Sequence, residues 1–344
     1  MRKYLFYIAI AVVLAGCSRP VKTEQERSLF VNDVVIKTTP VKNQGSGQLC
    51  WAYAMLATIE SEHLMRGDSV NLSTAFITRM RLQQMARARY LSQGASTFSL
   101  RGMAPLLIDM LVTVGAEPYD SYEDKDGLNV AVLSRKVARL ADMSASRRIG
   151  IDNMTEQLDN MLDRAMGYMP SRYVHMLGAE YTPLEFAHSV CGRDEYVSFT
   201  SFAHHPWGEE VALELPDNTQ GFRFHNLPID ELMKRIRKTL AEGHPVCWEG
   251  DISEPGFDFK QGVAEVDEHD RKATDIRRLS DLQHFLTTDD HCMELVGLAR
   301  DLQGHRYFIA KNSWGTHNKY GGFMYLSEDY VRLKTVAVVM PRTE

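Results

Sequence analysis

Three features are scarce in this sequence of 344 residues, and each absence excludes a class of protein. After about the first twenty residues, no run is apolar enough to span a bilayer, which excludes a polytopic membrane protein. Lys and Arg number 39 against 45 Asp and Glu, so the formal charge is −6 and no basic face for nucleic-acid phosphates is expected. We also find no internal repeat and no low-complexity tract. What remains is an ordinary globular composition, sufficient for one large domain or two moderate ones.

Cysteine is also scarce, with five residues in the chain. Secreted scaffolds that depend on disulfides usually carry a denser and even set, so we expect this fold to be held by its core. Once Cys17 and Cys50 receive the roles argued below, Cys191, Cys247 and Cys292 remain, an odd number. One bridge between Cys191 and Cys247 would be compatible with the sequence, but spacing alone does not establish it. Cys292 is expected to pack as a small hydrophobic residue.

The N-terminus has the pattern of a secretory signal. A basic pair precedes an apolar run at residues 4–14, which is too short for a transmembrane helix and suits a signal peptide. The Leu-Ala-Gly that precedes Cys17 resembles the lipobox of bacterial lipoproteins. That resemblance implies removal of residues 1–16, a lipid on Cys17, a tether at residues 17–33 and a lipid-anchored protein of the bacterial cell envelope, facing the periplasm or the cell surface. The alternative is an ordinary cleaved signal with an incidental cysteine.

The pattern changes along the chain from helical to strand-like, which predicts an α+β protein. Helix formers run without interruption from Cys50 to Gly67, and the apolar first half predicts a buried helix that the glycine ends. We expect a helical half that carries the nucleophile at residues 34–124, a mostly helical insertion at 125–245 and a β-rich half at 246–344. Further helices are expected at residues 74–90, 103–114, 130–142, 154–166 and 227–242, and strands at 34–36, 196–202, 210–215, 246–248, 292–299, 307–311, 323–326 and 335–340.

Cys50 lies where a glycine-rich loop becomes the predicted buried helix. A helix N-terminus carries a partial positive charge and free N–H groups, and both favour a thiolate over a thiol. The N–H of Cys50 can also face an oxyanion. Gln44, six residues earlier on the loop, can supply a second neutral donor. This loop–helix junction therefore indicates nucleophilic catalysis.

Two distant stretches can complete such a site. His291 begins a strand-like run after a polar turn, and it can take the thiol proton and later protonate a leaving amine. Asn312 follows it after 312 − 291 = 21 residues, a separation that suits two adjacent antiparallel strands with a turn at Gln303-Gly304. The amide oxygen of Asn312 can accept the second imidazole N–H, and Trp314 can cover that contact.

The three stretches resemble the papain-like cysteine peptidases. The family has a nucleophile motif C-G-[SA]-C-[WY] with His and Asn far downstream, and here the cysteine, the tryptophan after it, the Gln-to-Cys spacing and Asn-Ser-Trp-Gly all match. The earlier cysteine is replaced by Gly47, so the disulfide usual at that place cannot form, while Gln48 and Leu49 alter one side of the cleft. The resemblance implies catalytic Cys50, His291 and Asn312, an oxyanion hole with Gln44, and a cleft wall with Trp51, Trp314 and Gly102.

The separation from Cys50 to His291 is 291 − 50 = 241 residues, against about 130–150 in the usual papains. A core without the earlier cysteine and with a large insertion resembles the bleomycin hydrolase and bacterial aminopeptidase C branch. That branch implies a helical half and an antiparallel barrel-like half with the cleft between them, and a peptide substrate. It also implies a homo-oligomeric ring whose C-terminal tail limits cleavage to N-terminal residues. Only residues 341–344 follow the last strand-like run, so the sequence leaves the exopeptidase rule and the oligomer open.

Other functions stay open at this point. The same constellation could serve an endopeptidase or an amidase, or the chain could be a non-catalytic binding lipoprotein on a peptidase scaffold. We expect no cofactor and no metal, because His204 and His205 on an extended segment would point to opposite faces. The pair Glu60 and Glu62 is expected to serve the surface or helix packing rather than acid–base chemistry.

Overall fold

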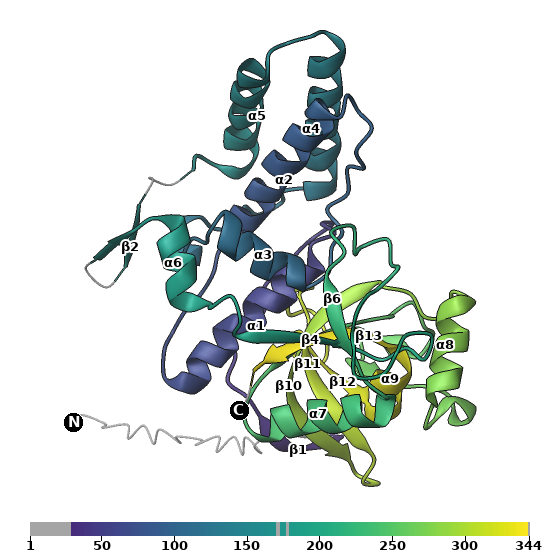
Figure 1. Cartoon of the computed structure of the whole chain (residues 1–344). Helices are drawn as coiled ribbons and strands as arrows, with labels where there is room; N and C mark the ends of the chain where they lie inside the picture. The colour runs from purple at the N-terminus through teal and green to yellow at the C-terminus, as the bar shows by residue number, and fades with distance from the viewer. Residues whose placement is uncertain (1–28, 170–172, 177–178, 343–344) are drawn as a thin grey trace, which may run out of the picture.

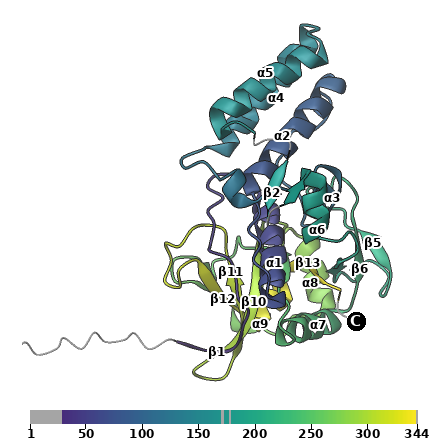
Figure 2. The same ribbon diagram turned by 90° about the vertical axis from the view of Figure 1, so that its left-hand side faces the viewer.

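The computed structural model describes residues 29–169, 173–176 and 179–342. Its helices are α1 (Cys50–Arg66), α2 (Thr74–Leu91), α3 (Pro105–Thr113), α4 (Val130–Ser146), α5 (Ile151–Met166), α6 (Pro183–Val190), α7 (Ile229–Ala241), α8 (Asp275–Gln283) and α9 (Glu328–Lys334). α2, α4 and α5 lie side by side as a projecting arm, while α1 lies between this arm and a large sheet (Figures 1 and 2). α1 is therefore enclosed from both sides.

Most strands belong to one largely antiparallel sheet. The strands are β1 (Phe30–Val35), β2 (Val174–Met176), β3 (Ala179–Tyr181), β4 (Tyr196–Thr200), β5 (Glu210–Ala212), β6 (Arg223–Asn226), β7 (Val246–Gly250), β8 (Phe257–Asp258), β9 (Val263–Ala264), β10 (His291–Asp301), β11 (Arg306–Lys311), β12 (Phe323–Ser327) and β13 (Thr335–Pro341). Their order is β5-β6-β4-β13-β7-β10-β11-β12-β9-β8, with β1 paired to β10 and a separate β2–β3 hairpin. The central strands β7, β10 and β11 are thus buried within the sheet.

α1 and α7 both pack on β7 and β10, from opposite faces. Successive side chains of a strand alternate between the two faces of a sheet. Accordingly, Cys247 and Cys292 belong to the apolar core around α1, whereas Trp248 and Met293 belong to the core around α7. This packing places β10 against α1, the helix that begins at Cys50.

The helical arm combines apolar packing with charged cross-links. Its helices bury Leu82, Val137 and Leu162 in the same core as α1. Arg79 and Arg89 of α2 add ion pairs of 2.7 Å to carboxylates on α5 and α4 respectively. Within the described residues, no helix combines the length and apolarity needed to cross a membrane.

The predicted helices and strands are confirmed with small shifts at their ends, and Gly67 ends α1 in the left-handed conformation (φ 92°). Three boundaries need correction. β1 begins at Phe30, inside the segment expected as tether, because Phe30 is buried and stacks on Tyr325 with ring centroids 3.9 Å apart. The strand expected at 34–36 therefore ends a longer one. β4, β5 and β6 fall inside the expected insertion at 125–245 but belong to the main sheet through the β4–β13 pairing, so the β-rich half draws on residues before 246.

Candidate active site

Cys50 is the first residue of α1, as the loop–helix junction predicts. Leu49 precedes it without a side-chain cap, and helix geometry leaves the N–H of Cys50 without an intrahelical acceptor. A hydrogen bond from the Cys292 thiol is the largest cause that holds the pKa of Cys50 well below its usual range. The hydrogen bond and charge of His291 lower this pKa further, against the effect of burial. The environment of Cys50 therefore favours a thiolate.

His291 and Asn312 meet as the strand spacing predicts. His291 begins β10, and Asn312 directly follows β11, its antiparallel neighbour. The His291 Nε2–H donates to Asn312 Oδ1 at 2.8 Å, which leaves Nδ1 for the thiol. Trp314 lies over the imidazole with ring centroids 4.7 Å apart, and His291 is only 3% exposed. The ring is therefore held in one orientation and shielded from water.

Gln44 is tied to the asparagine segment. Its backbone N–H donates to the Ser313 carbonyl at 2.8 Å, and its side-chain Oε1 accepts from Ser313 Oγ at 2.6 Å. The side-chain Nε2 donates one hydrogen to the Gly47 carbonyl at 3.0 Å. An amide nitrogen carries two hydrogens, so a second one is available to an oxyanion near Cys50.

Trp51 and Gly102 differ from the expected role of cleft wall. Trp51 is fully buried, and its indole N–H donates to the Leu100 carbonyl at 2.9 Å. A Cβ on Gly102 would lie 2.7 Å from a Leu106 methyl carbon and 3.3 Å from the Trp51 ring. Both residues are buried in the core, where they pack next to the segment around Leu100. Trp314, in contrast, is half-buried over the imidazole.

A buried charged network, which the sequence did not reveal, fixes the three stretches relative to one another. Glu60 of α1 accepts from Thr39 at 2.5 Å and from Lys42 at 2.8 Å. Lys311 in turn donates to Thr39 at 3.0 Å and pairs with Glu294 at 3.5 Å. Glu60 thus serves helix packing and not the surface, since its side chain is buried. Because Lys311 directly precedes the candidate asparagine, this network sets the distance between α1 and that asparagine.

A second missed feature is a buried carboxyl pair beside the nucleophile. Glu249 of β7 and Asp289, two residues before β10, influence each other's ionisation, and both interact electrostatically with Cys50. Burial raises the pKa of Asp289 to about 7, helped by the negative charge of Asp217, and burial also raises the pKa of Glu249 well above its usual range. Arg101 binds Asp217 at 2.7 Å and the Asp289 carbonyl at 2.5 Å. The pair therefore retains a proton at neutral pH.

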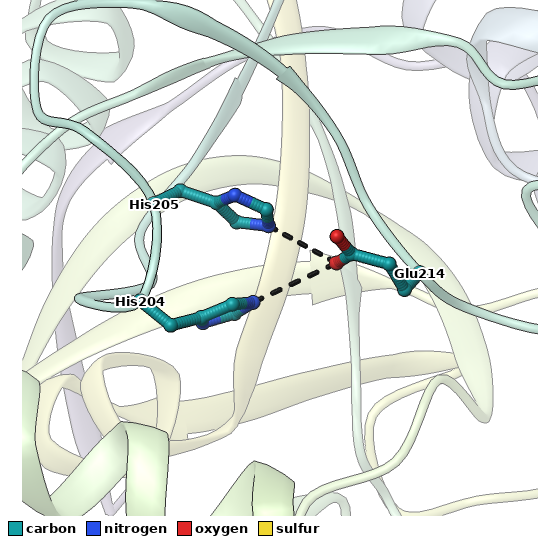
Figure 3. A group of neighbouring side chains, drawn as sticks. All are labelled: His204, His205 and Glu214. Carbon is teal, nitrogen blue, oxygen red and sulfur yellow. Dashed lines mark hydrogen bonds and ion pairs between the residues drawn. The ribbon is translucent and has the colours of Figure 1, made fainter.

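His204 and His205 contradict the expectation that adjacent histidines point apart. Residues 203–205 form a turn rather than an extended segment, and the two rings lie 4.0 Å apart. Both Nε2 atoms approach the same oxygen of Glu214, His205 at 3.0 Å and His204 at 3.6 Å (Figure 3). The expectation assumed that His204 and His205 lie on an extended segment. Because the segment is a turn, the argument that they cannot bind the same metal ion no longer holds.

The remaining cysteines are free. Cys191, Cys247 and Cys292 are buried and unbridged, which rules out the Cys191–Cys247 disulfide in this structure. Cys292 does more than pack in the core, because a hydrogen bond from its thiol lowers the pKa of Cys50. Cys17, the expected lipid site, lies outside the described residues.

Comparisons with known proteins identify the family of the chain and its fold. The profile of the Peptidase C1-like family matches residues 171–344, and that of the prokaryotic membrane lipoprotein lipid attachment site matches residues 1–18. No curated relative matches by sequence. Among solved structures, PepW from Lactobacillus rhamnosis is similar with a TM-score of 0.67 and 16% identity over 91% of this chain and 82% of that one. Bromelain from Ananas comosus, solved with the E64 inhibitor, has a TM-score of 0.43 and 15% identity over 92% of this chain and 99% of that one. The α+β fold is shared with PepW and is papain-like.

Proposed function

Because the chain belongs to the Peptidase C1-like family and is a cysteine peptidase anchored to the cell envelope by a lipid, we propose that Cys50 is its nucleophile. His291 is the proton carrier, and Asn312 orients it. The observation that carries this assignment is the convergence of three distant segments: the hydrogen bond and charge of His291 lower the pKa of Cys50, and the imidazole donates to Asn312 at 2.8 Å.

The reaction follows from these contacts. The Cys50 thiolate attacks the scissile carbonyl carbon, and the resulting oxyanion accepts hydrogen bonds from the Cys50 N–H and the free amide hydrogen of Gln44. The His291 imidazolium then gives its Nδ1 proton to the leaving amine, and a thioester remains on Cys50. His291 next takes a proton from water, whose oxygen attacks the thioester carbonyl. The products are a carboxylic acid and the regenerated thiol.

We further propose that the enzyme acts as an aminopeptidase. The support is the acidic environment beside Cys50, where Asp289 interacts with both Glu249 and Asp217, and Arg101 pairs with Asp217 at 2.7 Å. Asp289 and Arg101 also line a cavity of about 260 Å³. A substrate's α-ammonium group in this cavity would relieve the repulsion among the carboxyl groups, so a free N-terminus would be preferred over a blocked one.

Two experiments test these assignments separately. A thiol-reactive peptidyl epoxide should label the native chain and Cys247→Ala, a buried thiol on the neighbouring strand, but not Cys50→Ala. Absence of labelling in the folded native chain would refute the catalytic assignment and favour a binding lipoprotein. Fluorogenic peptides with free and acetylated N-termini then address specificity. Equal turnover of both would indicate an endopeptidase, and turnover of simple amides alone would indicate an amidase.

The carboxyl pair offers a sharper test of aminopeptidase specificity. Asp289→Asn should raise the KM for peptides with a free N-terminus and leave the KM for acetylated peptides unchanged, because only the former carry the ammonium group. An equal change for both substrates would contradict recognition of the N-terminus and leave the role of Cys50 untouched.

A further inference from the structure

A cluster of three side chains outside the catalytic site has the composition of a metal centre. His204 and His205 follow β4, and Glu214 follows β5. Their ligand atoms lie within 4.8 Å of one another (Figure 3). All three side chains reach solvent, with 32%, 15% and 71% of the side chain exposed respectively. An ion can therefore enter without opening the core.

The turn that carries the two histidines is built in advance. The fully buried Asn226 side chain donates to the carbonyls of Phe202, His205 and Pro206 at 3.0–3.1 Å, and its oxygen accepts from the Phe202 N–H at 2.9 Å. Phe202 itself is buried and anchors the start of the turn. Because the backbone is fixed in this way, both rings are directed to one side without any need for an ion.

The distances from Glu214 to the two histidines suit tetrahedral coordination. Zinc binds imidazole nitrogen and carboxylate oxygen at about 2.0–2.1 Å, which places two ligand atoms of a tetrahedron about 3.3 Å apart. The two histidine nitrogens lie 3.0 and 3.6 Å from Glu214 Oε2, on either side of that value.

We propose that His204, His205 and Glu214 bind a borderline divalent transition-metal ion of the Zn²⁺ class, with water or an external ligand in the fourth position. Imidazole nitrogen and carboxylate oxygen together suit such ions better than Ca²⁺ or Mg²⁺, which take oxygen ligands. The ion links the loop after β4 to the loop after β5. It takes part in no step of peptide hydrolysis.

The proposed metal site forms part of the cavity described above. His204 and Glu214 line the same cavity as Asp289 and Arg101. The loop of Glu214 continues to Asp217, which holds Arg101 through two hydrogen bonds of 2.7 and 2.9 Å. A bound ion therefore fixes one wall of the cavity that Asp289 and Arg101 also line.

The test uses the full chain in detergent with Cys50→Ala, so that the catalytic thiol cannot bind the ion. Calorimetric titration with Zn²⁺ should show one saturable site, weakened at least about tenfold by His204→Ala, His205→Ala or Glu214→Gln. The matched control is His305→Ala, which removes an exposed histidine paired with a single carboxylate at 2.7 Å. This control should bind as the parent does.

A second readout separates this site from the catalytic centre. Co²⁺ added to the Cys50→Ala chain should give a spectrum without a thiolate-to-metal charge-transfer band, because the three proposed ligands contain no sulfur. Zn²⁺ should also raise the Tm of the parent and of His305→Ala more than that of Glu214→Gln at the same concentration. Absence of saturable binding, a thiolate band, or equal affinity in a His204→Ala, His205→Ala double variant would overturn the proposal.

Discussion

Cys292→Ala tests how this chain activates its nucleophile. The hydrogen bond from the Cys292 thiol is the largest cause of the lowered pKa of Cys50, ahead of the contact with His291. Hydrogen bonds to charged groups contribute about 1.5–3 kcal/mol, and a thiol is a weak donor, so we take the lower end. Since 1.36 kcal/mol corresponds to one pKa unit, removal of the thiol should raise the pKa of Cys50 by about one unit.

The assay is the rate of alkylation by iodoacetamide as a function of pH, because only the thiolate reacts. The acidic limb of the profile should move up by about one pH unit in Cys292→Ala, and the acidic limb of kcat/KM should move with it. Cys292→Ser restores a donor and should restore most of the shift. Cys247→Ala is the matched control, because this buried thiol faces the same core without bonding Cys50.

Two outcomes would refute the reasoning. Superimposable profiles for Cys292→Ala and the native chain would show that the thiol contributes nothing to the ionisation of Cys50. An equal shift in Cys247→Ala would show that the effect arises from a cavity in the shared core rather than from a hydrogen bond. Urea unfolding of each variant would confirm that the compared proteins are folded.

Three further predictions follow from the contacts of the site. Asn312→Ala removes the 2.8 Å bond to His291 and should lower kcat/KM about 10–150-fold, the equivalent of about 1.5–3 kcal/mol; an unchanged value in the fluorogenic assay would exclude Asn312 from catalysis. Gln44→Ala should lower kcat about 10²–10³-fold with little change in KM, and a pure KM effect would contradict an oxyanion role. Burial beside Asp217 raises the pKa of Asp289 from 3.8 to about 7, so the folded state holds a proton that the unfolded state releases above about pH 4. Stability should therefore fall by about 4 kcal/mol as pH rises from about 4 to 7, and urea unfolding of Asp289→Asn across this range should show the slope reduced; the same slope in both proteins would contradict the assignment.

The residues that meet at the candidate site could be anticipated because local signals marked each one. Cys50 stood at a loop–helix junction, and the spacing of 21 residues from His291 to Asn312 matched adjacent strands, which the register of β10 and β11 confirms. The turn between these strands carries Gly304 with φ 88°, as its glycine predicted. Each of these features depends on a short stretch of sequence, in which hydrophobic periodicity and turn-forming residues can be recognised.

The features that the sequence did not predict depend on contacts between residues that are far apart in the chain. The Glu249–Asp289 pair forms only because β7 lies beside β10, and the sequence shows no pattern that relates the two residues. The histidine pair was misjudged for a different reason. Asn226, 21 residues after His205, shapes the backbone of the turn through its side chain, so local propensity could not reveal that His204 and His205 share a face.

Residues on or next to β7 and β10 have opposing effects on the negative charge of the Cys50 sulfur. Cys292 and His291 stabilise negative charge on Cys50, whereas ionisation of Glu249 or Asp289 would oppose it. The protonation of the carboxyl pair and the ionisation of the thiol are therefore linked, and a cation bound beside the pair favours both anions together. In the proposed function, the substrate's ammonium group is that cation. Its binding would then offset the negative charge of an ionised carboxyl group, so that the Cys50 thiolate is retained while the scissile bond is in place.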